Sequence, residues 1–184
     1  VRAEVPGPTA GKLVPRMRTT SMILYGIYTV MTLILIGLLC LLGMPMFDSF
    51  CIAFGTAGTG GFGVTAAGIG GYNSLAIEIV VGIFMLLFGI NFNVYHLLLL
   101  RKFKDAFSTE EVKVFLGIVA ASTIAIAINI VNFAGGIGNA LRQAFFQVSS
   151  IITTTGFATV DYEQWPEFAK HTIVLLMVIG ACAG

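Results

Sequence analysis

The sequence is poor in charge. Of its 184 residues only 10% are charged, whereas 57% are hydrophobic, and the mean hydropathy is +0.95. Soluble domains carry roughly 25% charged residues, so a soluble globular protein is excluded. Ten basic residues against nine acidic ones leave a net charge of +1. That balance excludes a nucleic-acid-binding face built on bulk positive charge, and we expect no nucleic-acid partner.

Cysteine, proline and tryptophan are also scarce, with three, five and one residues. These numbers exclude a collagen-like chain and a disulfide framework. Cys40, Cys51 and Cys182 lie far apart inside apolar runs, without His or Asp partners at ligand spacing, so we interpret them as small buried hydrophobes. We expect no cofactor. Glycine is the exception, because it has 22 residues and they are clustered, most densely between 55 and 71.

Four apolar segments indicate membrane helices, because about 20 apolar residues cross the roughly 30 Å of hydrocarbon. Their expected bounds are about 20–43, about 74–101, about 114–136, and from about 167 onward. The fourth segment is still apolar where the sequence stops, so we expect a piece of a longer protein. The sequence therefore predicts an all-α integral membrane protein.

Two shorter apolar segments lie between these spans, and a Gly/Thr tract follows each one. We expect pore helices at about 46–56 and about 140–152, followed by tracts 59–63 and 154–158. A helix of about 10–12 residues covers only about half the bilayer. Non-helical backbone cannot face lipid, so each tract must line a watery cavity or be buried in protein. A half-length helix followed by an extended tract predicts a re-entrant hairpin.

The basic residues predict the orientation of the chain. Four of the ten precede the first span and four lie at or between the second and third spans. The positive-inside rule makes residues 1–18 and the 102–113 loop cytoplasmic, so both tracts enter from outside. Most acids then lie outside and predict a vestibule that concentrates cations. They are Asp48, Glu78, Asp161, Glu163 and Glu167, against only Arg142 and Lys170.

An internal repeat relates the two halves. A shift of 95 residues carries the first span onto the third and brings four residues onto identical ones. The pairs are Thr59 and Thr154, Gly61 and Gly156, Phe62 and Phe157, and Phe50 and Phe145. The repeated unit is helix, pore helix with extended tract, helix. It is expected at 19–101 and at 114–184.

The tracts Thr59-Gly60-Gly61-Phe62-Gly63 and Thr154-Thr155-Gly156-Phe157-Ala158 suit the backbone of an ion filter. A cation in a pore needs oxygens that replace its hydration shell, and carbonyls of an extended tract supply them. Glycine permits the required backbone angles. The aromatic is expected to pack outward and brace the strand, and the carboxyl end of the pore helix favours a cation. The alternative, that the tracts are only turns or helix-packing segments, is weakened by their matched positions.

Four stretches together carry a family resemblance: SSIITTTGFATVDYEQWP, AFGTAGTGGFG, GINFNVYH and IGACAG. They closely resemble the membrane subunit of the bacterial Trk/Ktr potassium-uptake systems, above all its Trk-type (TrkH-like) branch, over nearly the whole chain. The resemblance implies four units in one polypeptide around a single pore, and this chain is similar to the second and third. It also implies a potassium-coordinating filter at Thr59, Gly60, Gly61, Phe62, Thr154, Thr155, Gly156 and Phe157.

The same resemblance implies further features. Potassium, as substrate, would bind at Thr59, Gly60, Thr154 and Thr155. A gating loop would begin at Gly180, Ala181, Cys182, Ala183 and Gly184. The implied partners are the remaining pore units, a second copy in a homodimer, a cytosolic nucleotide-binding regulatory subunit and the lipid bilayer. The implied location is the bacterial plasma (inner) membrane.

The expected function is therefore potassium uptake by a pore-forming subunit. A sodium-permeable or potassium/sodium co-transporting relative, and a piece that does not conduct by itself, stay open as alternatives. An intramembrane enzyme would need a nucleophile with a base in reach, and none is evident in the spans, so we expect no enzyme. Asn91, Asn93 and His96 in the second span favour interhelical hydrogen bonding over pore lining.

Overall fold

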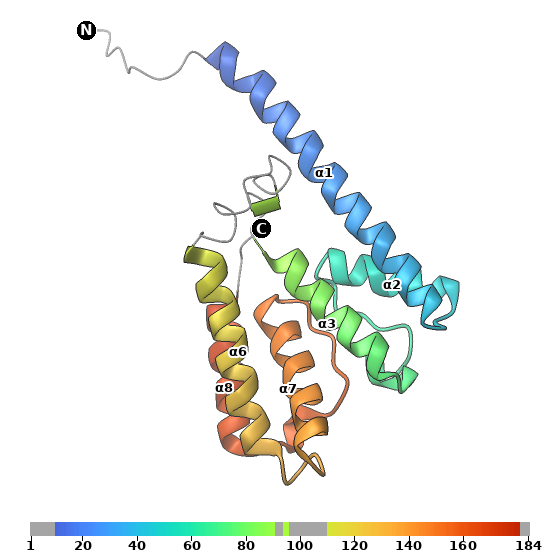
Figure 1. Cartoon of the computed structure of the whole chain (residues 1–184), viewed down its shortest axis with the longest axis vertical. Helices are drawn as coiled ribbons and strands as arrows, with labels where there is room; N and C mark the ends of the chain where they lie inside the picture. Colours follow the sequence, from blue (N-terminus) through green and yellow to red (C-terminus); the bar gives the residue numbers. More distant parts are fainter. Residues whose placement is uncertain (1–9, 91–93, 96–109, 181–184) are drawn as a thin grey trace, which may run out of the picture.

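The computed structural model describes residues 10–90, 94–95 and 110–180, and within these ranges every regular element is helical (Figure 1). The α-helices are α1 (Ala10–Leu41), α2 (Met46–Ala57), α3 (Leu75–Gly89), α6 (Glu110–Ile130), α7 (Ile137–Ile152) and α8 (Glu167–Ile179). Two short 3-10 helices follow the tracts, η1 (Gly68–Tyr72) and η2 (Tyr162–Gln164). The predicted all-α fold class is confirmed.

Two of the described helices are long and apolar enough to cross a bilayer. They are the Met22–Leu41 part of α1 and the whole of α6, whereas α2 and α3 are shorter apolar helices. Large apolar side chains such as Leu33, Ile128 and Val178 are exposed along α1, α6 and α8. Such outward apolar surface is what lipid or further protein covers in a membrane.

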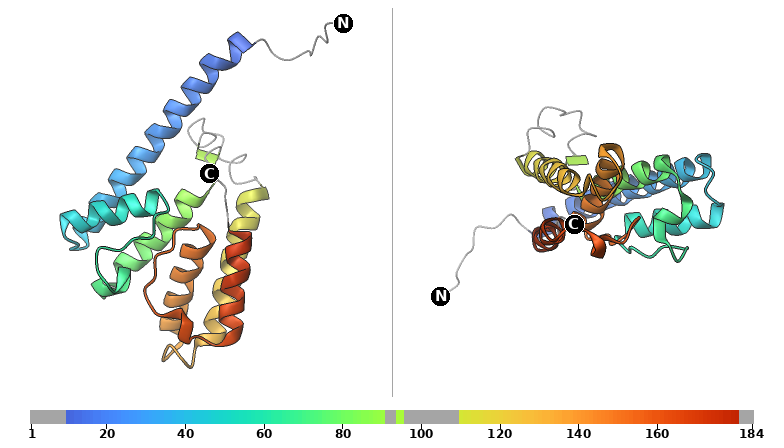
Figure 2. Two further views of the ribbon diagram at one scale, coloured as in Figure 1. Left: turned by 180° about the vertical axis from the view of Figure 1, so that it is seen from behind. Right: turned by 90° about the horizontal axis from the view of Figure 1, so that it is seen from below.

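The helices form two units that share one seam. Within the first unit α1, α2 and α3 contact one another, and within the second α6, α7 and α8 do the same. Helix α3 joins the units because it also packs along α7, and Figures 1 and 2 show these two helices side by side in the middle of the molecule. The cores interlock: Phe146 and Phe157 enter the first unit's core, and Leu86 enters the second's.

Local sequence explains where α2 begins and where α3 begins and ends. Pro45 precedes α2, and the Ser74 side chain caps α3 by accepting a hydrogen bond from the Ile77 amide at 3.5 Å. Helix α3 ends at Gly89, where Ile90 is extended. The Leu87 carbonyl near this helix end accepts two hydrogen bonds, from the Ile90 amide at 3.2 Å and from the Tyr95 hydroxyl at 2.5 Å.

The unit boundaries drawn from the sequence stay predictions. The second span is expected to run to about 101, but residues 91–93 and 96–109 lie outside the described part, and Asn91, Asn93 and His96 with them. The third span is expected at about 114–136, and α6 covers Glu110–Ile130 before a turn that contains Gly135 and Gly136 at positive φ.

Candidate ion-conducting site

The two pore helices end in the same way. Two backbone hydrogen bonds recur at positions 95 residues apart, each joining the start of a tract to its pore helix. In the first unit they are Gly58 N to Phe54 O (2.8 Å) and Gly60 N to Gly55 O (2.7 Å); in the second they are Thr153 N to Ser149 O (3.3 Å) and Thr155 N to Ser150 O (2.9 Å). The internal repeat read from the sequence is therefore also a repeat in space.

Backbone angles in the tracts repeat at the same spacing. Thr59 and Gly61 have φ values of 49° and 69°, and Thr154 and Gly156 have 56° and 89°. A β-branched residue in the left-handed region is uncommon and costs about 1–2 kcal/mol. Strain of this kind clusters at functional sites, where surrounding structure holds it in place. Two strained threonines at matched positions mark these tracts as the candidate site.

Side chains of its own pore helix hold the second tract. The buried Ser150 hydroxyl donates to the Phe157 carbonyl at 2.6 Å. The Thr153 hydroxyl donates to the Ser149 carbonyl at 2.7 Å, and it also lies 2.8 Å from the Thr155 hydroxyl. The first tract lacks the equivalent of the Ser150 bond, because Gly55 stands at that position. The second tract is therefore braced more firmly by its own unit.

The first tract rests directly on the second. A Cβ atom on Gly61 would overlap the Thr155 carbonyl oxygen and would lie 3.0 Å from the Gly156 carbonyl carbon. Gly156 is less crowded, because a Cβ there would come no nearer than 3.9 Å to the Gly61 Cα. Close backbone approach therefore requires glycine at 61 more strictly than at 156.

The paired aromatics have different surroundings. Phe157 is 1% exposed, and its ring packs against Gly55 of the first unit, where a Cβ would lie 3.1 Å from the ring's Cζ. Phe62 is 86% exposed. The Phe62 ring therefore braces no other element among the described residues, and its bracing role stays a prediction. The Phe157 ring packs on α2, the pore helix of the first unit. Among the described residues no pore helix lies against Phe62 in the same way.

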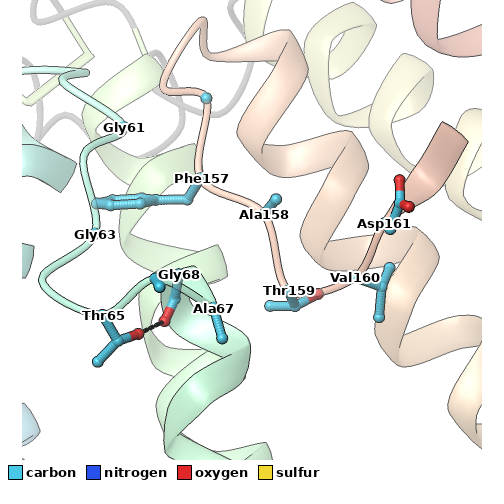
Figure 3. A pocket seen from close by; sticks show the side chains of 12 residues that line it. Gly61, Gly63, Thr65, Ala67, Gly68, Phe157, Ala158, Thr159, Val160 and Asp161 are labelled. Carbon is cyan, nitrogen blue, oxygen red and sulfur yellow. Dashed lines mark hydrogen bonds between the residues drawn. The ribbon is translucent and has the colours of Figure 1, made fainter.

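A cavity of about 510 Å³ lies between the two tracts and their outer flanks (Figure 3). The first unit contributes Gly61, Gly63, Thr65, Ala66, Ala67 and Gly68, and the second contributes Gly156, Phe157, Ala158, Thr159, Val160 and Asp161. Asp161 is the one charged residue of this lining. Its carboxylate accepts from the Glu163 amide at 3.1 Å and from Gln164 Nε2 at 2.9 Å, which fixes its orientation.

The predicted acidic vestibule is only partly present. The expectation that Glu78 belongs to this vestibule is wrong. Glu78 is 3% exposed and is bound to Arg142, because α3 turns its side chain toward α7. Asp48 accepts a hydrogen bond from the Tyr72 hydroxyl at 2.6 Å. Burial, followed by this hydrogen bond and the charge of Asp48, raises the pKa of Tyr72 above its ordinary value. Among the expected acids, Asp161 is the one that lines the cavity.

The expected gating segment lies at the end of the described chain. Gly180 follows α8, and a Cβ on it would lie 3.3 Å from the Thr154 Cγ2 atom, so α8 ends beside the second tract. Residues Ala181, Cys182, Ala183 and Gly184 lie outside the described part. Within the described residues no group of three or more His, Cys, Asp or Glu side chains could hold a metal ion.

These features define an all-helical membrane protein that is built from tandem helix–pore-helix–helix units. The chain belongs to the TrkH family, described as cation transport proteins, whose sequence model matches residues 3–184. This membership confirms the family resemblance. The family consists of transport proteins, which confirms the prediction that the chain is not an enzyme.

Individual relatives cover all of this chain. It is 34% identical over 189 residues to the Trk system potassium uptake protein TrkH of Salmonella typhimurium. It is 35% identical over 188 residues to the protein of the same name from Escherichia coli K12. The crystal structure of the potassium transporter TrkH from Vibrio parahaemolyticus matches 97% of this chain with a TM-score of 0.83 at 28% identity. The chain spans about 39% of the length of these curated relatives.

Proposed function

We propose that this chain supplies two of the four filter strands of a potassium-uptake pore. The main-chain oxygens at Thr59, Gly60, Thr154 and Thr155 would coordinate dehydrated potassium, together with those of the glycines and phenylalanines that follow. The observation that carries the proposal is the matched pair of left-handed residues in each tract, Thr59 with Gly61 and Thr154 with Gly156.

The alternation of positive and negative φ angles suits these tracts to the coordination of a cation by backbone carbonyls. In an ordinary strand successive residues face opposite sides. Left-handed residues at every second position turn successive carbonyls toward one side instead, which is what a carbonyl filter needs. Gly60 and Thr155, between the left-handed residues, do not have positive φ. Helices α2 and α7 both end at the tracts, and their partly negative carboxyl ends favour a cation there.

The choice of potassium comes from the relatives. The Salmonella and Escherichia proteins are potassium uptake proteins by name, and the Vibrio structure is that of a potassium transporter. Glycine stands at both central filter positions of this chain, which agrees with that assignment. We carry the substrate over to this chain on its family membership and on the backbone of its tracts.

The exposed face of the first pore helix supports completion of the pore by further units. Phe47, Phe54 and Phe62 are 71%, 61% and 86% exposed. The residues 95 positions later are Arg142, Ser149 and Phe157; the last two are buried, and Arg142 binds Glu78 of the first unit. A preceding unit that packs on α2 as the first unit packs on α7 would cover all three phenylalanines.

The remaining partners are inferred from the family to which the chain belongs. We infer that the other pore units belong to the same polypeptide, that the transporter is a homodimer, and that a cytosolic nucleotide-binding subunit regulates it. We place it in the bacterial inner membrane with residues 1–18 and the 102–113 loop in the cytoplasm.

Uptake of rubidium and sodium tests the proposal. The complete protein would be expressed in a bacterium that lacks its own potassium-uptake systems, with Gly61→Ser and Gly156→Ser variants. We expect both variants to lower the rubidium-to-sodium ratio. Gly37→Ser on α1, where no atom lies within 4 Å of a new Cβ, is the matched control. An unchanged ratio in both filter variants would contradict the filter assignment.

A further inference from the structure

An ion pair between a half-buried arginine and a buried glutamate connects the two units. Arg142 of α7 donates from Nε to Glu78 Oε2 at 2.6 Å and from Nη2 to Oε1 at 2.5 Å. Glu78, in the first turn of α3, is 3% exposed, and Arg142 is 32% exposed. A two-pronged bond between guanidinium and carboxylate fixes both the separation and the rotation of the two groups. The pair therefore aligns α7 against α3.

The rest of the seam between α3 and α7 is close-packed. A Cβ on Gly82 would lie 2.8 Å from the Phe145 ring, and a Cβ on Gly89 would lie 2.8 Å from the Thr153 Cγ2 atom. Gly82 follows Glu78 by one helical turn, and Thr153 immediately precedes the second filter tract. The ion pair is thus the outer end of a continuous contact that runs down to the base of that tract.

Movement of α7 would reach the filter directly. The Ser150 carbonyl of α7 accepts from the amides of Thr155 (2.9 Å) and Gly156 (3.3 Å), and the Ser150 hydroxyl holds the Phe157 carbonyl. Thr155 and Gly156 in turn lie against Gly61 of the first tract. A shift of α7 along α3 therefore changes how the two tracts face each other.

The pore helix does not need this arginine to form. The equivalent position of α2 holds Phe47, and α2 is helical without any ion pair there. Desolvating two charges is costly, so a buried pair is a weak source of stability. An ion pair at one pore helix and an apolar residue at the matching position of the other point to a role in aligning α7 with α3 rather than in helix stability.

We propose that Glu78 and Arg142 form a positioning pair that sets the register of the second filter tract against the first and thereby controls discrimination between potassium and sodium. The inference rests on the proposed filter. Neither residue touches the ion; each acts through α7 and the backbone bonds at its carboxyl end.

The test uses the complete protein in the uptake assay described above. Arg142→Lys keeps the charge but loses the planar fork, and Glu78→Gln keeps the shape but loses the charge. We expect each to lower the rubidium-to-sodium ratio by on the order of tenfold, a size typical of coupled neighbours. The exchanged pair, Glu78→Arg with Arg142→Glu, should recover part of that loss. The exposed pair Glu167–Lys170 supplies the control, and Glu167→Gln should leave the ratio unchanged.

The ratio does not depend on how much protein reaches the membrane, so it separates alignment from simple destabilisation. Lower abundance with an unchanged ratio in Arg142→Lys and Glu78→Gln would overturn the inference. If either variant fails to accumulate, Glu78→Asp takes its place, because it keeps the charge and shortens the side chain by one carbon. An unchanged ratio in Glu78→Asp would likewise overturn the inference. Gly61→Ser and Gly156→Ser are run in parallel: an altered ratio in either with no effect at the ion pair refutes only the positioning role, whereas an unchanged ratio in both refutes the filter.

Discussion

Substitution of the two central glycines by alanine should have unequal effects, although the repeat makes them equivalent. Both have positive φ, so each alanine costs about 1–2 kcal/mol in backbone strain alone. At Gly156 the new methyl group would have ordinary space. At Gly61 it would overlap the Thr155 carbonyl oxygen, which is backbone and is itself fixed by the bonds to α7. Overpacking of this kind adds about 1–3 kcal/mol, so Gly61→Ala should be the more damaging.

The assay compares thermal unfolding of the detergent-solubilised complete protein and initial rubidium uptake in cells. We expect the unfolding midpoint to fall in the order wild type, Gly156→Ala, Gly61→Ala, with rubidium uptake in the same order. Gly37→Ala, in open space within α1, should be neutral or stabilising by up to about 1 kcal/mol, because alanine is the better helix former. Equal effects at the two filter glycines, or a neutral Gly61→Ala, would refute the reasoning about close backbone approach.

Three further predictions concern the supports of the tracts. Ser150→Ala removes the buried bond to the Phe157 carbonyl and should cost about 1–3 kcal/mol in unfolding free energy, with weaker rubidium affinity in a competition assay; unchanged affinity would count against a bracing role. Phe157→Ala should cost about 3–5 kcal/mol in unfolding free energy, measured by thermal denaturation, because its ring is fully buried against the first unit; a loss below about 1 kcal/mol would contradict that packing. The Tyr72 phenol should ionise above its ordinary pKa of 10.0, so its contribution to stability is complete below pH 10 and is lost as the pH rises through the higher folded value. Phenolate absorbance of wild type minus Tyr72→Phe measures this, and ionisation at the ordinary value would contradict both the burial of the phenol and its bond to Asp48.

The presence of helices in the apolar segments and of non-helical tracts after the two short ones could be predicted because the signals are local. A run such as 22–43 is apolar along its whole length, and glycine beside threonine at 59–61 and at 154–156 recurs at one spacing. The chemistry of an extended tract after a half-length helix depends only on neighbours in the chain. These features therefore needed no knowledge of which helix packs on which.

The contacts between units could not be predicted in the same way. Glu78 and Arg142 are 64 residues apart in the sequence, and each resembles an ordinary surface charge on the outer side. Their pairing becomes evident only from the packing of α3 against α7. Phe62 and Phe157 occupy equivalent positions in the repeat, yet Phe62 is exposed and Phe157 is buried, because Phe157 packs against Gly55 of the first unit. Local sequence carries no signal for a contact whose partner belongs to another unit.

The two tracts depend on each other unequally, and this inequality explains how one ion pair could influence both. The second tract is held by hydroxyl and backbone bonds to α7, whereas the first lacks the serine bond and lies with Gly61 against Thr155. A left-handed threonine stays strained only while its surroundings fix it. The strain at Thr154 is held by bonds to its own pore helix, whereas in the first tract Gly61, two residues after the strained Thr59, lies against Thr155 of the neighbouring tract. Any change that moves α7 therefore loosens the first tract as well as the second, so the alignment of α7 with α3 bears on both halves of the proposed filter.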